Sequence, residues 1–198
     1  DLVGLGGWAV PVGFLDDRSN LWETEVAGLP VLGPVEAAAE VAQRLSVTHL
    51  LPAVGDNRLR QRFWKFGQSL GLEPLSAVHP TCIIAGSAFL GPGLQAVAGV
   101  IVNPEAQIGA NVILNTSCSV DHHCRVGDHC FVGPGARLGG TACLGEGAFL
   151  GINSCVLPGL KVGEWAVLGA GAVAVRDVPT GVCSVGVPAR PRGQRDGC

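Results

Sequence analysis

The chain has little charge and no methionine. Asp, Glu, Lys and Arg make up 15% of its 198 residues, and the formal net charge is −3. Proteins that bind nucleic acid usually concentrate basic residues on one face, so nucleic acid is not an expected partner. No apolar run approaches the roughly 18 residues of a membrane-spanning helix, and no signal peptide stands at the front. Because no methionine encodes a start, we expect the sequence to begin internally or to carry an altered front.

The chain also lacks any C-x-x-C pair, although it contains eight cysteines. Zinc sites and redox motifs usually need that close spacing. Cys118, Cys124 and Cys130 are instead six residues apart. We therefore expect the thiols to be small buried side chains in a reducing cytoplasm, neither disulfide-bonded nor bound to metal.

What the sequence does contain is a six-residue repeat over about half its length. Apolar residues recur in unbroken register at these positions: Val78, Ile84, Leu90, Ala96, Val102, Ile108, Leu114, Val120, Val126, Val132, Leu138, Leu144, Leu150, Val156, Val162, Leu168 and Ala174. A helix repeats every 3.6 residues and a simple strand every two, so neither explains the pattern. A period of six predicts a parallel β-helix, in which each hexad is a short strand plus a turn.

Two further positions of the hexad agree with this interpretation. The residue after each apolar one is often Gly, Asn or Asp, as at Gly91, Asn103, Gly109, Asn115, Asp121 and Gly127. These residue types tolerate positive φ, so we expect a left-handed turn position there. The fifth position is mostly Ala, Cys or Ser, as at Ala106, Cys118, Ala136 and Ser154, and we expect it to form an inside corner.

Residues 1–77 show another pattern, which predicts a small parallel α/β domain. Residues 12–15 are expected to form a buried strand that ends in Asp16 and Asp17, and residues 48–55 a second strand that ends in Gly55. A helix with an apolar face is expected to open at residues 33–36, with Pro34 in its first turn. Another is expected at about residues 58–71, capped by Asp56 or Asn57, with Leu59, Phe63, Phe66 and Leu70 on one face. Ligands on such sheets bind at the carboxyl ends of the strands.

The candidate catalytic residues lie in the hexad at residues 120–125 and in the one after it. Three of the five histidines, His122, His123 and His129, lie within residues 122–129 on an otherwise apolar, Gly-rich ladder. A histidine there could act as a general base on an amine or hydroxyl that attacks an acyl group, and turn N–H groups could stabilise the oxyanion. His123 and His129 occupy one slot in consecutive hexads, so they face different sides, and no metal site is expected within one chain. We interpret His129 as an inert surface residue.

A covalent nucleophile has less support. The Ser and Cys residues fall mainly in repeat-core slots, and no G-x-S-x-G turn occurs. We therefore expect direct transfer without a covalent intermediate.

The chain resembles the hexapeptide-repeat sugar acetyltransferases of the bacillosamine-pathway and sialic acid O-acetyltransferase type. The matching stretches are VGFLDD (12–17), AVGDNRLR (53–60), NVILNTSCSVDHHCRVGD (111–128), FLGINSCVLPGL (149–160) and VGVPAR (185–190). The resemblance implies a Rossmann-like sugar-nucleotide-binding domain at residues 1–77, a left-handed β-helix at residues 78–180 and a C-terminal extension at residues 181–198. It also implies a homotrimer, acetyl-CoA as co-substrate and active sites between adjacent β-helices.

The same resemblance implies roles for single residues. The family's catalytic histidine falls on His122, and His123 stands where the family usually has Glu or Asp, which leaves Asp121 or a partner-chain group to tune the base. Acetyl-CoA contacts fall on Phe131, which replaces a second family histidine, and on Gly140, Ile152 and Ala170. Nucleotide-sugar contacts fall on Asp16, Asp17 and Gly55. Only 11 residues precede the VGFLDD strand, and Gly4 to Gly7 make a weak phosphate loop, so either the family's first β–α unit is missing or the acceptor is bound differently.

The leading hypothesis is therefore acetyl transfer from acetyl-CoA to the amino group of a nucleotide-linked sugar, with His122 as general base. O-acetylation of a sialic acid-like sugar is the close alternative. A metal-dependent hydratase with ligands from two subunits, and a catalytically weak trimeric scaffold, are the others.

Overall fold

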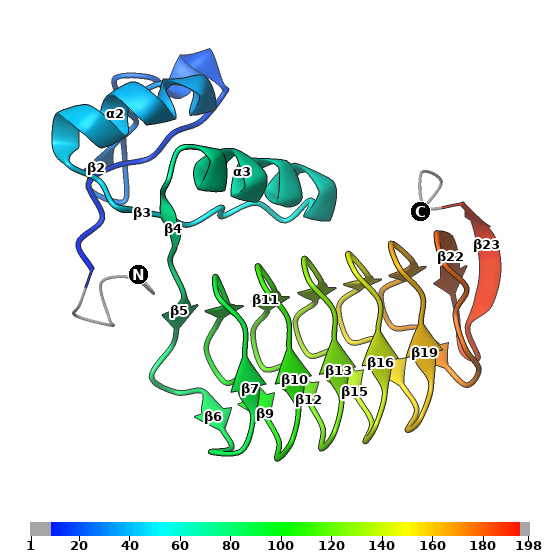
Figure 1. Cartoon of the computed structure of the whole chain (residues 1–198). Coiled ribbons are helices and arrows are strands. Elements are labelled where there is room, and N and C mark those ends of the chain that lie inside the picture. The colour runs from blue at the N-terminus through cyan, green and yellow to red at the C-terminus, as the bar shows by residue number, and fades with distance from the viewer. Residues whose placement is uncertain (1–8, 195–198) are drawn as a thin grey trace.

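The hexads fold into two-residue strands, each with the ladder residue in second place. The computed structural model describes residues 9–194, and in it the strands stack into a parallel β-helix (Figure 1). Each strand pairs with the one 18 residues further on, as Ile113 does with Phe131, so three strands make one coil. The parallel β-helix expected from the period is confirmed.

The coil has three faces. One holds β7 (Phe89–Leu90), β10 (Gln107–Ile108), β13 (Arg125–Val126), β16 (Cys143–Leu144) and β19 (Lys161–Val162). The second holds β5 (Ala77–Val78), β8 (Gln95–Ala96), β11 (Ile113–Leu114), β14 (Phe131–Val132), β17 (Phe149–Leu150) and β20 (Val167–Leu168). The third holds β6 (Ile83–Ile84), β9 (Ile101–Val102), β12 (Ser119–Val120), β15 (Arg137–Leu138), β18 (Cys155–Val156) and β21 (Val173–Ala174).

Three columns of turns join these faces, and we number them as edges. Edge 1 contains residues 121–124 and 139–142, edge 2 contains residues 127–130 and 145–148, and edge 3 contains residues 133–136 and 151–154. Residues 18 apart are stacked on the same edge, as the hydrogen bond from Thr141 N to His122 O shows (2.9 Å).

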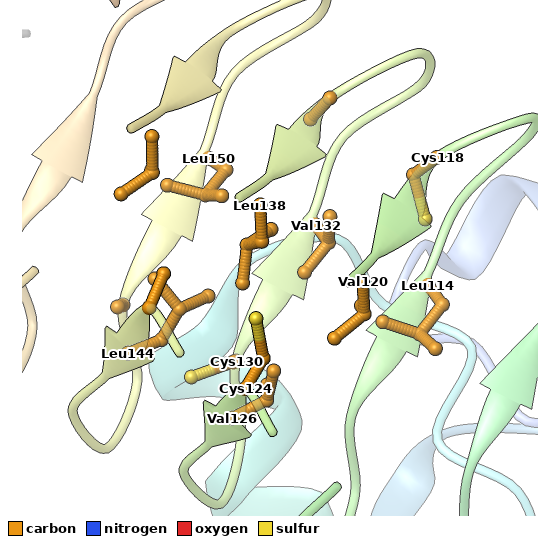
Figure 2. Close-up of a cluster of buried hydrophobic side chains, with 14 of the residues drawn as sticks. Leu114, Cys118, Val120, Cys124, Val126, Cys130, Val132, Leu138, Leu144 and Leu150 are labelled. Carbon is orange, nitrogen blue, oxygen red and sulfur yellow. The ribbon is translucent and has the colours of Figure 1, made fainter. Parts of the chain in front are cut away.

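The ladder residues fill the interior together with the small corner residues (Figure 2). Leu114, Val120 and Val132 are fully buried, and the Cys118 and Cys124 side chains lie among them. Burying one such Val or Leu side chain contributes about 1.5–3 kcal/mol. A single coil would leave these groups in water, so the stack is stable only as a whole.

The glycine after each ladder residue has a different cause from the one expected. Left-handed φ recurs two residues later, from Gly93 to Gly171, and includes His123 (φ 58°) and His129 (φ 60°). Glycine fills the earlier slot where neighbouring coils approach closely: a Cβ on Gly133 would lie 2.5 Å from Leu150 O. The positive-φ interpretation of that slot was therefore wrong.

The C-terminal segment is a hairpin. Strand β22 (Val182–Val185) pairs in parallel with β20 and antiparallel with β23 (Arg190–Gln194). Residues 186–189 form the connecting turn, and residues 191–194 lie in β23. Cys183 is disulfide-bonded, so the expectation of free thiols was wrong there.

The N-terminal unit contains short elements. In chain order these are η1 (Ser19–Leu21), β1 (Glu25–Val26), β2 (Leu29–Pro30), η2 (Val35–Ala37), α2 (Ala38–Leu45), β3 (His49–Leu50), α3 (Asn57–Ser69) and β4 (Glu73–Pro74). Strands β3 and β4 are parallel, and β1 and β2 antiparallel. Residues 12–15 form only a bridge from Phe14 to Val31, and Phe14 is 38% exposed, so the buried strand expected there was wrong. Residues 4–7 lie outside the described range.

Helix α3 begins at its predicted cap: the Asp56 carboxylate accepts a hydrogen bond from Leu59 N (2.8 Å). Its most buried residues are Asn57, Arg60, Trp64 and Gly67, not the predicted apolar face, whose members are only half-buried. No helix in residues 9–194 is long and apolar enough to cross a membrane.

Candidate functional site

Helix α3 attaches the N-terminal unit to edge 2 of the β-helix, and it lies along the coils in Figure 1. The buried Arg60 guanidinium donates to the backbone oxygens of His129 (2.6 Å), Cys130 (3.1 Å) and Asn111 (3.2 Å). Asn57 donates to the oxygens of Gly147 (3.0 Å) and Ala148 (3.2 Å). The turn carbonyls of three successive coils thus receive donors from one helix, which also fixes the position of the Gly55 loop before it.

His122 and His123 project from the edge 1 turn that follows β12, and both are exposed. Their rings meet edge to face, with centroids 5.3 Å apart and an interplanar angle of 85°. The two Nδ1 atoms are 3.1 Å apart, a hydrogen-bond distance. The structure therefore brings the two predicted catalytic residues into direct contact.

The Asp121 carboxylate contacts the backbone of its own turn and the preceding coil. Its Oδ1 accepts from the His122 backbone N–H (2.7 Å) and from Asn103 Nδ2 (3.1 Å). These bonds shape the turn and tie it to the preceding coil. Within one chain, the His122 ring is hydrogen-bonded to His123 and not to Asp121.

Gly140 lies one coil beyond His122 on edge 1, and the His122 ring covers it. A Cβ on Gly140 would stand 2.6 Å from His122 Nε2 and 2.7 Å from its Cε1. The His122 ring can therefore lie here because Gly140 has no side chain. A predicted acetyl-CoA contact and the predicted base are neighbours.

His129 is buried (7% exposed) on edge 2, so its interpretation as a surface residue was wrong, although an inert role agrees with its contacts. Its Nδ1 is 2.8 Å from Asn111 Nδ2, and its ring packs edge-on against Trp64. Burial lowers the pKa of His129, while the carboxylates of Asp128 and Glu146 act in the opposite direction. A neutral ring that accepts from Asn111 fits this environment.

The other predicted acetyl-CoA residues lie elsewhere on the coil. Ile152 and Ala170 are exposed neighbours on edge 3, where Gly171 N donates to Ile152 O (2.7 Å). Phe131 lies on β14, stacked on Phe149 with ring centroids 4.7 Å apart. One chain alone therefore does not bring Phe131, Ile152 and Ala170 together with His122 and Gly140.

The predicted nucleotide-sugar residues lie in the N-terminal unit. Asp17 Oδ1 accepts from Val35 N (2.9 Å) and so caps η2. The Asp16 carboxylate pairs with the Arg18 guanidinium (2.9 Å), whose hydrogen bonds lower the pKa of Asp16 to about 2. Gly55 is exposed, with open space where a side chain would be.

The sequence alone did not identify several residues that lie beside the predicted site residues or against edge 2. Trp22 Nε1 donates to Asp16 O (2.7 Å), so an aromatic ring and Arg18 both stand beside the predicted acid. Asn57 and Arg60 were missed as donors to edge 2. Their spacing with Trp64 and Gly67, on one side of α3, was the available signal. Nothing local in the sequence indicated Trp22.

The family models match the repeat. Residues 105–140 match the bacterial transferase hexapeptide (six repeats), and residues 142–174 match the hexapeptide repeat of succinyl-transferase. A Schizosaccharomyces pombe protein described as an acetyltransferase is 53% identical over 36 residues, which is 18% of this chain and 17% of that protein. The match thus spans less than a fifth of that relative's length.

Solved structures match much more of the chain. Perosamine N-acetyltransferase (PerB) from Caulobacter crescentus, in complex with CoA and GDP-perosamine, is 38% identical with a TM-score of 0.85, over 91% of this chain and 84% of that one. The chain belongs to the hexapeptide-repeat sugar N-acetyltransferases. The acetyltransferase domain of PglB from Neisseria gonorrhoeae is 32% identical with a TM-score of 0.89, over 96% of this chain and 91% of that one.

Membership of this family makes the chain an acyltransferase with a left-handed β-helix. PglB has also been solved in complex with acetyl coenzyme A. Within residues 9–194, no group of three or more His, Cys, Asp or Glu side chains is placed to hold a metal ion.

Proposed function

We propose that the protein transfers an acetyl group from acetyl-CoA to the amino group of a nucleotide-linked amino sugar. The observation that carries this proposal is the placement of His122, an exposed ring with its Nδ1 engaged by His123 and its Nε2 edge over Gly140. The relation to an enzyme solved with CoA and GDP-perosamine supports the choice of both substrates.

The proposed chemistry is direct transfer. The amine lone pair attacks the thioester carbonyl carbon, and His122 Nε2 takes the proton that the nitrogen loses. Turn N–H groups stabilise the negative charge on the carbonyl oxygen. The C–S bond then breaks, CoA leaves as a thiolate that takes up a proton, and an amide remains. No side chain of the protein forms a covalent bond with the acetyl group.

We propose that the acetyl-CoA site is completed between copies of a homotrimer. His122 and Gly140 lie on edge 1 and Ile152 and Ala170 on edge 3 of the same chain, so one edge of each kind from adjacent copies would form one site. Ile152 is 55% exposed and available to a neighbouring molecule. Phe131, in place of the second family histidine, would contribute an apolar contact.

We assign the nucleotide-sugar site to a Rossmann-like domain at residues 1–77, where Asp16, Asp17 and Gly55 lie. The catalytic β-helix would comprise residues 78–180 and the extension residues 181–198. Because Asp17 caps η2 and Asp16 pairs with Arg18, the two acids would act mainly by shaping the loop. The Gly55 backbone, open to solvent, would approach the diphosphate.

The experiment is an acceptor panel with purified protein and acetyl-CoA. Free thiol release is measured with amino sugars linked to UDP, GDP and dTDP, for the wild type and for His122→Ala. We expect turnover with at least one nucleotide-linked amino sugar and a loss of about 100-fold or more in kcat for the variant. Full turnover by His122→Ala would exclude His122 as the base.

Two other functions remain distinguishable in the same assay. Acetylation of a sialic acid-like sugar, with no activity on any amine, would identify an O-acetyltransferase. The replacement of a family histidine by Phe131 favours a weak scaffold instead. Calorimetry with CoA decides that case, because a scaffold would show no binding at millimolar ligand.

A further inference from the structure

The contact between His122 and His123 restricts where protons can lie. Their Nδ1 atoms are 3.1 Å apart, so one must donate and the other accept. When both rings are neutral, a His122 that donates from Nδ1 carries its lone pair at Nε2. A His122 that accepts at Nδ1 instead carries its proton at Nε2 and cannot take another from substrate there.

We propose that His123 is a positioning residue that accepts the Nδ1 proton of His122 and so holds His122 in the tautomer with a free Nε2. This inference rests on the proposed function, in which that nitrogen is the base. His123 does not touch the substrate; it acts through the ring beside it, as a neutral acceptor where a carboxylate would be the stronger one.

The backbone fixes the direction of the His123 ring. His123 has φ 58°, in the recurring left-handed slot of the hexad, and its N–H donates to Pro104 O (3.1 Å) in the preceding coil. The same slot carries Gly159 and Asn153 elsewhere, so glycine and asparagine are compatible with this turn. The acceptor therefore stands on a rigid element, and two substitutions are available that do not strain the backbone.

Within one chain, His123 is the side chain hydrogen-bonded to the His122 ring. Asp121 Oδ1 accepts from the His122 N–H and from Asn103. Glu105 holds the His123 slot one coil earlier, Thr141 holds it one coil later, and Arg125 begins the next strand. Cys124 is buried, and burial raises its pKa to about 11, so it stays a thiol.

At low pH, protonation of either ring removes the free lone pair at His122 Nε2. A proton taken up by His123 at Nδ1 reverses the hydrogen bond, so His122 accepts at Nδ1 and its one remaining proton moves to Nε2. A proton taken up by His122 at Nε2 blocks it directly. A single protonation of the pair thus abolishes the base, whichever ring holds the proton.

The test uses three variants in the full-length protein. We expect His123→Gly, which removes the acceptor without straining φ, to lower kcat about 10- to 100-fold while the Kd for CoA stays within twofold. His123→Asn, which keeps a neutral acceptor, should restore part of that loss. His123→Glu should keep turnover and move the acid limb of the kcat profile to higher pH by about one unit, since a carboxylate stabilises the protonated ring. An unchanged kcat for His123→Gly, or an unmoved limb for His123→Glu, would overturn the proposal.

A second readout does not depend on turnover. ¹⁵N NMR of the imidazole nitrogens at pH 8 should show His122 protonated at Nδ1 in the wild type and shifted toward the Nε2-protonated form in His123→Gly. A wild-type His122 protonated at Nε2 refutes the role of His123 even if the enzyme is active. An inactive wild type with His122 protonated at Nδ1 contradicts the proposed function alone.

Discussion

At the scale of single residues, the candidate site depends on side chains that are missing as much as on those present. His122 can lie over edge 1 because Gly140 has no Cβ beneath its ring. Gly140 does not need positive φ, so its value lies in the space it leaves and not in its backbone freedom. A methyl group there would meet the ring and not the backbone.

We therefore expect Gly140→Ala to fold normally and to lower kcat by up to about 100-fold, because a displaced base reaches the acceptor poorly. Gly86→Ala is the matched control: Gly86 occupies the same turn slot three coils earlier, and a Cβ there meets nothing within 4 Å. Steady-state kinetics with acetyl-CoA checks both. Equal activity of the two alanine variants would show that the ring moves aside without consequence.

The limits of sequence interpretation are clearest at this scale. The ladder residues and the small corner positions follow from composition and period, and the structure confirms them. The glycine slot was identified correctly but explained wrongly, because close approach of neighbouring coils leaves the same sequence signal as positive φ. The contact of two adjacent histidine rings depends on the φ of His123, which the pattern alone does not give.

At the scale of elements, α3 is the joint between the two parts of the molecule. The sequence predicted its length and a cap at Asp56 or Asn57, which are local properties. It did not predict which side faces the β-helix, because a periodic apolar stripe normally identifies the buried side. Here the partner surface is a column of turn carbonyls, and donors such as Asn57 and Arg60 satisfy it better than apolar groups can.

Replacing Arg60 by Met should destabilise the protein by about 3 kcal/mol or more. The substitution leaves the buried oxygens of Asn111, His129 and Cys130, and the part-buried oxygen of Val54, without this donor. Urea unfolding measures the loss. Arg62→Met, on the exposed side of the same helix, should remain within about 0.5 kcal/mol of the wild type. A comparable loss in both variants would mean that α3 contributes through its charge and not through this joint.

At the scale of the whole molecule, the β-helix interior contains cysteine thiols that stay protonated in the native state well above neutral pH. Burial raises the pKa of Cys118 and Cys130 to about 12 and that of Cys124 to about 11. The native state keeps these protons, whereas the unfolded chain loses them near its ordinary thiol pKa of 9.0. Their contribution to stability is thus complete below pH 9 and is lost progressively as pH rises toward 11 and 12.

We expect the free energy of unfolding to fall between pH 9 and pH 11 by about 1 kcal/mol per pH unit for each of these thiols. The chain has no tyrosine, whose side chain would titrate in the same pH range. Urea titrations at several pH values check the slope. The variant with Cys118, Cys124 and Cys130 all changed to Ala should have lower stability at pH 8 but a flatter profile. An equal slope in both proteins would place the alkaline transition elsewhere.

The repeating coil also decides which changes of length the protein can absorb. Strands 18 residues apart pair in register on the same face. Inserting or deleting one full coil away from residues 121–140 would return every later strand to its own face and leave the His122 turn intact. A change of a single hexad would rotate all later strands by one face, and within residues 123–139 it would also separate Gly140 from His122. Among relatives of this protein, we therefore expect insertions and deletions in the β-helix to come in multiples of three hexads and to lie outside the turn that carries His122.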